Sequence, residues 1–301
     1  MGRLTAIVLG SAAGGGFPQW NCRCAVCRLA WAGNARVKAR TQASLAVSAD
    51  AEHWILLNAS PDLRAQLQAT PALRPRTGLR DSPIAAVVLT GAEVDQIAGL
   101  LTLRERQSFA LLATGETLAT LAANPIFGVL AAGVVTRHTI VPDRPFALPG
   151  GLQAELFIVP GKAALYLEDE HPALGGESGA NVGVEIVCSA RRLAYVPGAA
   201  GVTEAVLERL ARADVVLFDA TLFVDDEMIT SGTGTKTGRR MGHMPLDGER
   251  GTLSALAHLK GRRILTHINN TNPILIEGSA ERRKVEAAGF EVAEDGMEIV
   301  L

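Results

Sequence analysis

The segment LTGAEVDQIAGL, residues 89–100, joins an apolar run to a stretch with helical spacing. The run IAAVVLT (84–90) has the continuous apolar character of a strand covered on both faces. The residues IAGLLTLRER (97–106) then place apolar side chains at helical intervals. The polar turn between them carries Glu93 and Asp95. A turn that leads from a strand into a helix is where α/β proteins place binding and catalytic groups, so the segment predicts an α/β fold with a site here.

The rest of the chain continues this alternation of strands and helices. Further strands are predicted at 4–10, 42–49, 53–60, 110–113, 152–161, 182–188, 192–198, 215–221 and 264–270. Helices are predicted after an N-cap at Ser60 or Asp62, from Thr114, over 202–214, and over 253–260 with Gly261 just past the end. Each half begins with antiparallel pairs and continues with strand–helix–strand units. We therefore expect one α/β (α+β) domain over residues 1–301, built as a four-layer αβ/βα sandwich.

Composition narrows the classes of partner. The chain has 301 residues, 48% hydrophobic, with a net charge of −2 and no large cluster of Lys and Arg. A nucleic-acid partner is therefore not expected. The longest apolar candidate, residues 126–135, is far shorter than the roughly 18 residues of a membrane span, so no membrane partner is expected either. The N-terminus is interpreted as a strand entering a Gly-rich turn, and a cytoplasmic location is predicted.

Three of the four cysteines lie close together in NCRCAVC, as Cys22, Cys24 and Cys27. Thiolates at this spacing can converge on one ion from a single loop, and a set of sulfur ligands indicates structural Zn²⁺. A free thiol cluster or a redox pair is the alternative. We refer to residues 20–28 as the zinc clip. Three cysteines leave a tetrahedron incomplete, so the fourth ligand must come from elsewhere. The glycine-rich stretch before the clip lacks the ending of a phosphate loop, and a substrate role for Gln19 or Trp20 stays open.

Polar residues also follow several predicted strands, as candidates for a second site. Glu93 and Asp95 follow one strand, Asp219 and His267 end two others, and His243 lies in a predicted loop. Carboxylates and imidazoles held at strand ends form a site suited to a metal with oxygen and nitrogen ligands. The alternatives are ordinary ones. Asp95 can cap a helix, and His267 can be a hydrogen-bonded core residue.

Four motifs together carry a resemblance to a known family: AAGGGFPQWNCRCAVC (12–27), FDATLF (218–223), MGHMP (241–245) and THINNTNPIL (266–275). They resemble the pyrroloquinoline quinone (PQQ) synthesis protein B family, which has the metallo-β-lactamase fold. The resemblance spans essentially the whole chain. It implies the same fold and a role in PQQ synthesis.

The resemblance also implies which metal ligands are missing. Metallo-hydrolases of this fold carry T-H-x-H-x-D-H, and that pattern places Gly91 and Glu93 at the first two His positions. Asp95 keeps the Asp position, and Gln96 takes that of the last His. The fold's next His falls at Gly161 or Lys162. The first of two usual metal sites has therefore lost nearly all its ligands, which disfavours two-metal hydrolysis.

The second metal site keeps its ligands by the same resemblance. Asp95, Asp219 and His267 match the fold's ligands, and His243 matches a loop His beside the reaction centre. Two His and a carboxylate with open positions are typical of non-haem Fe(II) oxygenases. The active-site metal is therefore expected to be Fe²⁺, for which other divalent metals can substitute. His243, Glu93 and Asp95 are the candidate catalytic residues, and Glu93 competes with His243 for a ligand position.

The function implied is an iron-dependent hydroxylase that oxidises the Glu- and Tyr-derived PQQ precursor. A carrier of PQQ or its precursor toward the periplasm is the main alternative, and a one-metal hydrolase is a third. The expected partner is the peptide-derived precursor; other PQQ-pathway proteins and a homodimer remain open. In relatives with the zinc clip, a His three places after the final site His completes the zinc. Asn270 stands there, which leaves the fourth ligand open among Asn270, water and another side chain.

Overall fold

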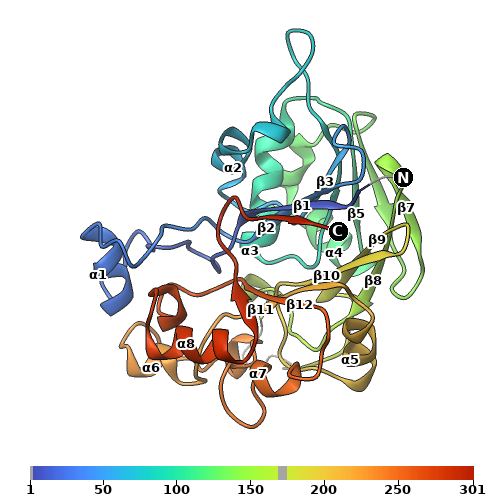
Figure 1. The fold of residues 1–301 in the computed structure, drawn as a ribbon. Coiled ribbons are helices and arrows are strands. Elements are labelled where there is room, and N and C mark those ends of the chain that lie inside the picture. The colour runs from blue at the N-terminus through green and yellow to red at the C-terminus, as the bar shows by residue number, and fades with distance from the viewer. Residues whose placement is uncertain (1–2, 169–174) are drawn as a thin grey trace.

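The computed structural model describes residues 3–168 and 175–301 and consists of two facing β-sheets with helices outside them (Figure 1). The first sheet has the strand order β14-β1-β2-β3-β4-β5-β6. Its strands β14, β1, β2 and β3 are antiparallel, and β3 to β6 are parallel. In chain order the strands are β1 (Thr5–Gly10), β2 (Ser44–Ser48), β3 (Trp54–Leu57), β4 (Ile84–Val88), β5 (Phe109–Ala113), β6 (Val135–Thr139) and β14 (Glu298–Val300).

The second sheet repeats this plan with the strand order β13-β12-β11-β10-β9-β8-β7. The strands from β7 to β10 are antiparallel, and those from β10 to β13 are parallel. They are β7 (Phe146–Leu148), β8 (Leu152–Ile158), β9 (Val182–Cys188), β10 (Arg191–Val196), β11 (Val215–Asp219), β12 (Arg262–Thr266) and β13 (Phe290–Val292). Antiparallel strands therefore lead into parallel ones in each half, as the sequence predicts.

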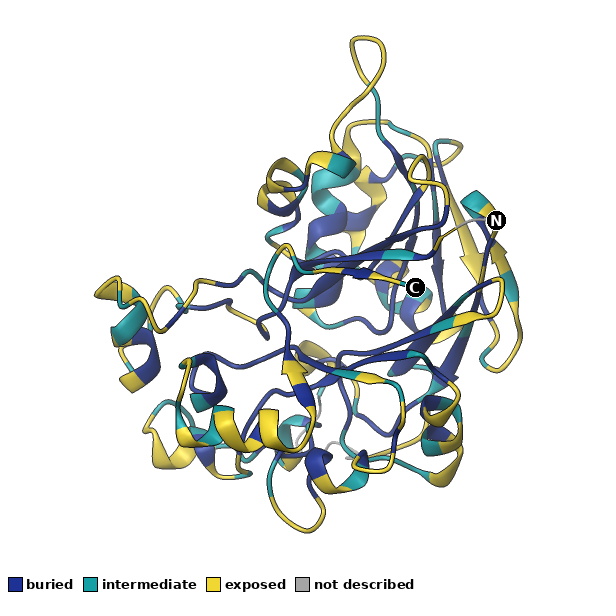
Figure 2. Cartoon of the chain, in the orientation of Figure 1, coloured by how far each residue is buried: buried dark blue, intermediate teal, exposed yellow. Residues whose placement is uncertain are grey.

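Apolar side chains fill the space between the sheets and the space under the helices. Most strand residues of the two sheets are buried (Figure 2). Val47 and Leu156, from different sheets, belong to one buried cluster. Two further clusters lie on the outer faces. The helices are α1 (Ala25–Trp31), α2 (Leu63–Ala69), α3 (Val94–Ile97), α4 (Gly115–Ala123), α5 (Glu204–Ala211), α6 (Glu227–Thr230), α7 (Thr252–Ala255) and α8 (Ala280–Ala287). Burial of apolar surface in three layers stabilises the predicted four-layer sandwich, which is confirmed.

Several predicted elements differ in detail. The helix expected over 97–106 begins earlier, as α3, and continues as a 3₁₀ helix over Ala98–Arg104. The helix expected over 253–260 is wrong beyond Ala255, where α7 ends. Gly261 does not end a helix there. A Cβ atom at this position would lie 2.3 Å from the carbonyl oxygen of Ala213, so close backbone contact requires glycine. The edge strands β6 and β7 were not predicted; four of five β6 residues are exposed.

Candidate metal centre and its pocket

The carboxyl ends of β4, β11 and β12 meet at one edge of the sandwich and carry the candidate ligands. Asp95 lies in α3 just after β4, Asp219 is the last residue of β11, and His267 follows β12. Because β11 and β12 are parallel neighbours with Asp219 opposite Thr266, the next residue, His267, lies beside the carboxylate. His267 has a φ of 56°, an uncommon conformation for a residue other than glycine. His243 comes from the loop between α6 and α7.

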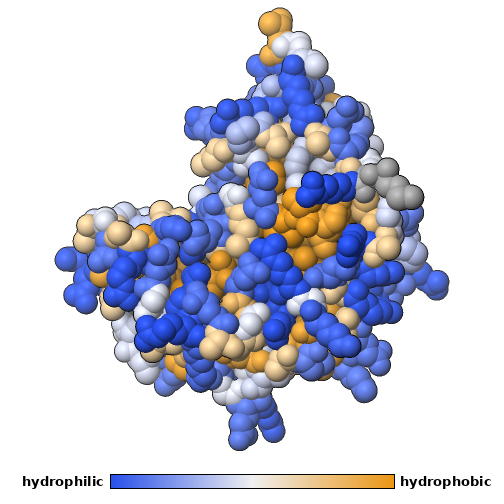
Figure 3. Space-filling model, in the orientation of Figure 1, coloured by the Kyte–Doolittle hydropathy of each residue, from blue (hydrophilic) through white to orange (hydrophobic). Residues whose placement is uncertain are grey.

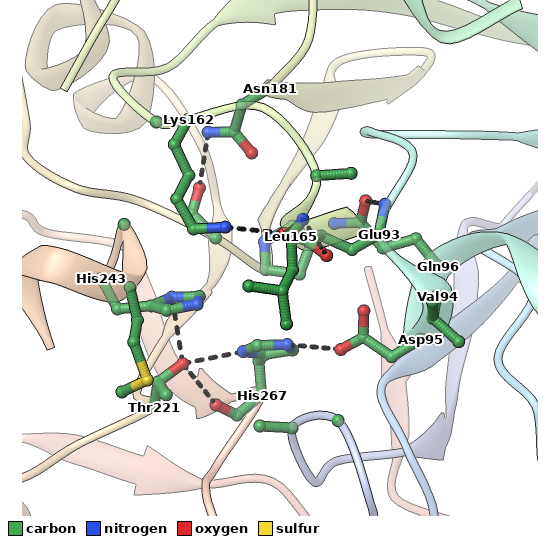
Figure 4. A pocket seen from close by; sticks show the side chains of 18 of the residues that line it. Glu93, Val94, Asp95, Gln96, Lys162, Leu165, Asn181, Thr221, His243 and His267 are labelled. Atoms are coloured by element: carbon green, nitrogen blue, oxygen red, sulfur yellow. Dashed lines mark hydrogen bonds and ion pairs between the residues drawn. The ribbon is translucent and has the colours of Figure 1, made fainter. Parts of the chain in front are cut away.

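Contacts join these side chains into one network, and Figure 4 shows the part of it that runs from His243 through Thr221 and His267 to Asp95. His243 Nδ1 lies 2.6 Å from Asp219 Oδ2, and His267 Nδ1 lies 3.5 Å from Asp219 Oδ1. On the other side of its ring, His267 Nε2 lies 2.9 Å from Asp95 Oδ2. The Thr221 hydroxyl donates to Asp219 Oδ1 at 2.6 Å and lies 2.8 Å from His267 Nδ1. The two imidazole rings are stacked with centroids 5.2 Å apart.

Mutual charge stabilisation sets the protonation of this cluster. Burial opposes protonation of His267, but hydrogen bonds and charge attraction from Asp219 and Asp95 outweigh it and raise its pKa to about 10. Burial likewise opposes ionisation of Asp219, yet the two imidazoles hold its pKa well below the usual range. The pKa of Asp95 is lowered in the same way, mainly by His267. The fold therefore favours ionised carboxylates paired with a protonated His267, so an ion bound by this imidazole has to replace its proton.

The cluster fits one metal ion. Ligand atoms of Asp219, His243 and His267 all lie within 4.8 Å of one another. Two ligand atoms bound to one ion at about 2.0–2.2 Å lie within roughly 4.4 Å of each other, and the 2.6 Å and 3.5 Å separations between Asp219 and the two imidazoles meet that limit. His267 can give one ring nitrogen to the ion while the other stays bonded to a carboxylate, an arrangement that fixes the tautomer of a ligand. Asp95 is the carboxylate nearest to Nε2 of that ring, and its predicted role as a metal ligand remains a prediction.

Glu93 lies in the same pocket but belongs to a different set of contacts. Its carboxylate accepts hydrogen bonds from the backbone N–H of Leu165 at 3.1 Å and from Lys162 Nζ at 3.0 Å. Its backbone N–H donates to Gln96 Oε1, within a capping box at the start of α3. Among the described residues, the group that could hold an ion at the cluster does not include Glu93. Its predicted catalytic role remains a prediction.

Protein side chains fill the space where the resemblance places the lost imidazoles. A Cβ atom at Gly91 would lie 2.6 Å from Gln96 Oε1 and 3.0 Å from the carbonyl oxygen of Ala180. A Cβ atom at Gly161 would lie 2.4 Å from Asn181 Nδ2. The amide of Asn181 is itself held by the carbonyl oxygens of Val159 and Gly198, each 3.1 Å away. A side chain at either position would therefore have to displace close neighbours, the end of Gln96 at Gly91 and the side chain of Asn181 at Gly161.

The zinc clip lies in an arm that extends away from the sheets (Figure 1). The sulfur atoms of Cys22, Cys24 and Cys27 lie within 4.8 Å of one another, as zinc ligands must. Asn270 Nδ2 is 3.1 Å from Cys22 Sγ and 3.3 Å from Cys27 Sγ. The amide thus lies at the open corner of the cysteine set, and a half-turn about its last side-chain bond would present Oδ1 to an ion. Asn270 as the fourth ligand remains a prediction.

A pocket of about 580 Å³ opens over the cluster. Its lining includes Asp95, Thr221, His243 and His267 on one side and Lys162, Glu168 and Lys236 on another. Gln19 reaches this lining, whereas Trp20, with 83% of its surface exposed, is not among the lining residues. Sequence reasoning missed Thr221, Asn181, Glu168 and Lys236 as pocket residues. Only Thr221 had a local signal, because it lies two residues after Asp219 in FDAT.

Comparison with known proteins places this geometry in a family. Residues 53–268 match the model of the beta-lactamase superfamily domain. The chain is 56% identical over 296 residues to coenzyme PQQ synthesis protein B of a strain of Methylorubrum extorquens, covering 98% of this chain and 99% of that protein. It is 54% identical to the protein of the same description from Rhizobium meliloti, covering 99% and 98%. This chain belongs to the coenzyme PQQ synthesis protein B family.

Solved structures agree with this membership. The crystal structure of Zn²⁺-bound PqqB from Methylobacterium extorquens has 55% identity and a TM-score of 0.97, covering 99% of this chain and 100% of that one. A diphosphatase of the PhnP family has 22% identity and a TM-score of 0.70, covering 99% and 97%, and shares the fold. The predicted metallo-β-lactamase fold is confirmed. Within the described ranges, no helix is long and apolar enough to cross a membrane.

Proposed function

We propose that this member of the PQQ synthesis protein B family is a mononuclear non-haem iron hydroxylase that acts on the Glu- and Tyr-derived precursor of PQQ. The observation that carries the proposal is the cluster of Asp219, His243 and His267, whose two histidines line the pocket while Asp219 is buried behind them. Two imidazoles and a carboxylate are the ligand set of mononuclear Fe(II) oxygenases. The filled positions beside Gly91 and Gly161 argue against a second ion and therefore against two-metal hydrolysis.

The ligands are held by a polar network. Asp219 accepts the backbone N–H groups of Ala199 and Thr221, both at 3.0 Å, which fixes both of its carboxylate oxygens. The Thr221 hydroxyl lies between Asp219 and His267 and sets the orientation of that ring. Asp95 holds the far nitrogen of the same ring. Such support keeps ligand positions within the narrow limits that a metal site requires.

The reaction proposed is insertion of one oxygen atom into a C–H bond. Dioxygen supplies that atom, its second atom leaves as water, and two electrons and two protons come from an external reductant such as ascorbate. Bound Fe²⁺ would supply the activation of dioxygen. The chain binds and orients the precursor in the pocket, and its apolar wall, including Ala92, Leu165 and Met241, limits the access of water to the reacting carbon.

Product analysis with isotope-labelled dioxygen tests the proposal. The protein is loaded with Fe²⁺ without air, then mixed with Glu–Tyr dipeptide, ascorbate and ¹⁸O₂. A dipeptide that gains one labelled oxygen is the expected product. Asp219→Asn should abolish it, while Glu208→Gln on the exposed face of α5 should not. Oxygen incorporated from water with bond cleavage would instead indicate a hydrolase, and tight binding of an unchanged dipeptide would indicate a carrier.

A further inference from the structure

Five charged side chains gather at one wall of the pocket. Lys162 and Glu168 come from the segment after β8, Lys236 and Arg240 from the loop after α6, and Glu93 from the turn after β4. Lys162 Nζ lies 3.0 Å from Glu93 Oε1 and 2.8 Å from Glu168 Oε1. Arg240 Nη1 lies 3.2 Å from Glu168 Oε2, and Lys236 Nζ lies 3.5 Å from the same oxygen. Lys162, Glu93, Glu168 and Lys236 line the pocket. The wall facing the candidate metal centre is therefore ionic.

Lys162 is fixed in place and has no capacity left for a ligand's charge. Its side chain is only 8% exposed, and its ammonium contacts both carboxylates and the carbonyl oxygen of Ala163 at 3.2 Å. A Cβ atom at Gly242 would lie 2.9 Å from Lys162 Cγ, so the aliphatic stem runs against this glycine. In Figure 4 the ammonium points from above His243 toward Glu93. Lys162 thus compensates one carboxylate and holds the wall together.

Lys236 differs from its neighbours because the carboxylates of this set do not fully compensate its positive charge. The set holds three cations, Lys162, Lys236 and Arg240, and two carboxylates, Glu93 and Glu168. Among the described residues, the set therefore carries a net charge of +1. Lys236 makes the longest of these ion pairs, at 3.5 Å, and its side chain is 38% exposed. Its ammonium therefore keeps donors available to a pocket ligand.

We propose that Lys236 is a specificity-determining residue that binds a carboxylate of the substrate, with Arg240 as a positioning residue that neutralises Glu168. This inference rests on the proposed function, since it assigns a subsite to the precursor. A carboxylate entering a partly enclosed pocket loses hydration and needs a charged partner to offset that cost. Lys236 supplies that partner on the pocket wall, where its ammonium lies 3.5 Å from Glu168 Oε2 and its side chain is 38% exposed. The substrate is thereby oriented with its neutral part toward the ligands.

Calorimetric binding of two dipeptides, Glu–Tyr and Gln–Tyr, to the zinc-loaded protein tests this subsite without turnover. The side chains of the two probes have the same shape and differ in charge. Wild type should bind Glu–Tyr about tenfold more tightly, as expected for one charge-assisted hydrogen bond. Lys236→Gln should remove that preference, and Lys236→Arg should keep most of it. Arg239→Gln, an exposed cation three residues away, should behave as wild type.

Equal binding of both dipeptides by wild type, no binding of either, or an unchanged preference in Lys236→Gln would overturn the subsite. The binding result is independent of iron chemistry. A protein that prefers Glu–Tyr through Lys236 but incorporates no oxygen retains the subsite and loses the hydroxylase proposal. A protein that binds both dipeptides with equal affinity and hydroxylates both equally well retains the hydroxylase proposal and loses the subsite.

Discussion

At the scale of single residues, the candidate centre is defined by what each side chain contacts. Asp219 and His243 face each other at 2.6 Å, whereas Glu93 is engaged by Lys162 and the backbone of Leu165. Both His243 and Glu93 were candidates for the same ligand position. Their contacts now separate them, since only His243 lies within the ligand cluster among the described residues.

Iron content should therefore respond differently to the two substitutions. His243→Ala removes a ligand atom and should lower bound iron to well below one per chain after gel filtration. Glu93→Ala leaves the cluster intact and should keep iron, while it frees Lys162 and slows single turnover. Elemental analysis of the two variants side by side is the measurement. Full iron in His243→Ala, or loss of iron in Glu93→Ala alone, would exchange the roles assigned here.

Glu227 gives a pH-dependent prediction away from the centre. Burial raises the pKa of this carboxyl to about 7, although hydrogen bonds from Thr271 and the backbone of Phe223 oppose the shift. The folded state therefore favours the neutral form. Its contribution to stability is full below about pH 4.5 and is lost as pH rises through 7, by about 3 kcal/mol.

Urea unfolding at several pH values between 5 and 8 measures this contribution. In Glu227→Gln, most of this decrease in unfolding free energy with rising pH should be absent. Glu298→Gln, on an exposed position of β14, serves as the control and should retain the wild-type slope. A fall of equal size in Glu227→Gln and wild type would show that Glu227 does not carry the effect.

Sequence reasoning reached some of these residues and missed others for a physical reason. Asp219 and His267 end buried apolar strands, so their polarity is visible against the local pattern. Glu168 and Lys236 lie in irregular segments far apart in the chain, and no local periodicity links them. Their contact exists only because the second sheet folds both segments onto one wall. Residues brought together by such long-range folding leave no mark in a short window of sequence.

At the scale of elements, the segment 176–181 runs against the turn after β4 and closes the former first site. Gly91 forms a β-bridge with Asn181, and Gly161 forms one with Gly176. The lengths and ends of most strands followed from apolar runs bounded by turns. The short α7 and the exposed edge strands did not, because tertiary contacts rather than local pattern decide them.

Restoring a histidine at the turn should not restore a two-metal site. Gly91→His must displace Gln96 or the backbone at Ala180, so we expect a stability loss of about 1–3 kcal/mol. Metal content at the cluster should stay at one ion. Unfolding free energy and elemental analysis measure the two effects. A stable Gly91→His variant that binds a second ion would show that the first metal site lacks only a histidine ligand at position 91.

The zinc clip allows a clean test of its own. Cys24 Sγ accepts a hydrogen bond from Cys27 N and caps α1, a role that a serine hydroxyl can also fill. Cys24→Ser should therefore keep the cap but lose zinc, and the arm should become the first site of proteolysis. Cys188→Ser in β9 should retain zinc. Zinc retained in full by Cys24→Ser would contradict the prediction that Cys24 is a zinc ligand.

At the scale of the whole molecule, two sheets meet so that strand ends from both halves face one pocket. β4 of the first sheet brings Asp95, and β11 and β12 of the second bring Asp219 and His267. A polar surface surrounds apolar regions on the face in Figure 3, as expected of most protein surfaces. The centre therefore gains the supporting contact from Asp95 to His267 only when the two halves pack.

Counting and locating metal in crystals most directly tests the claim that this centre holds one ion. The protein is crystallised after exposure to excess Mn²⁺ at neutral pH, and anomalous scattering locates the ions. We predict one ion bound by Asp219, His243 and His267, in addition to the ion in the zinc clip. A second ion about 3.5–4 Å from the first would contradict the account, since that spacing is typical of two-metal hydrolases.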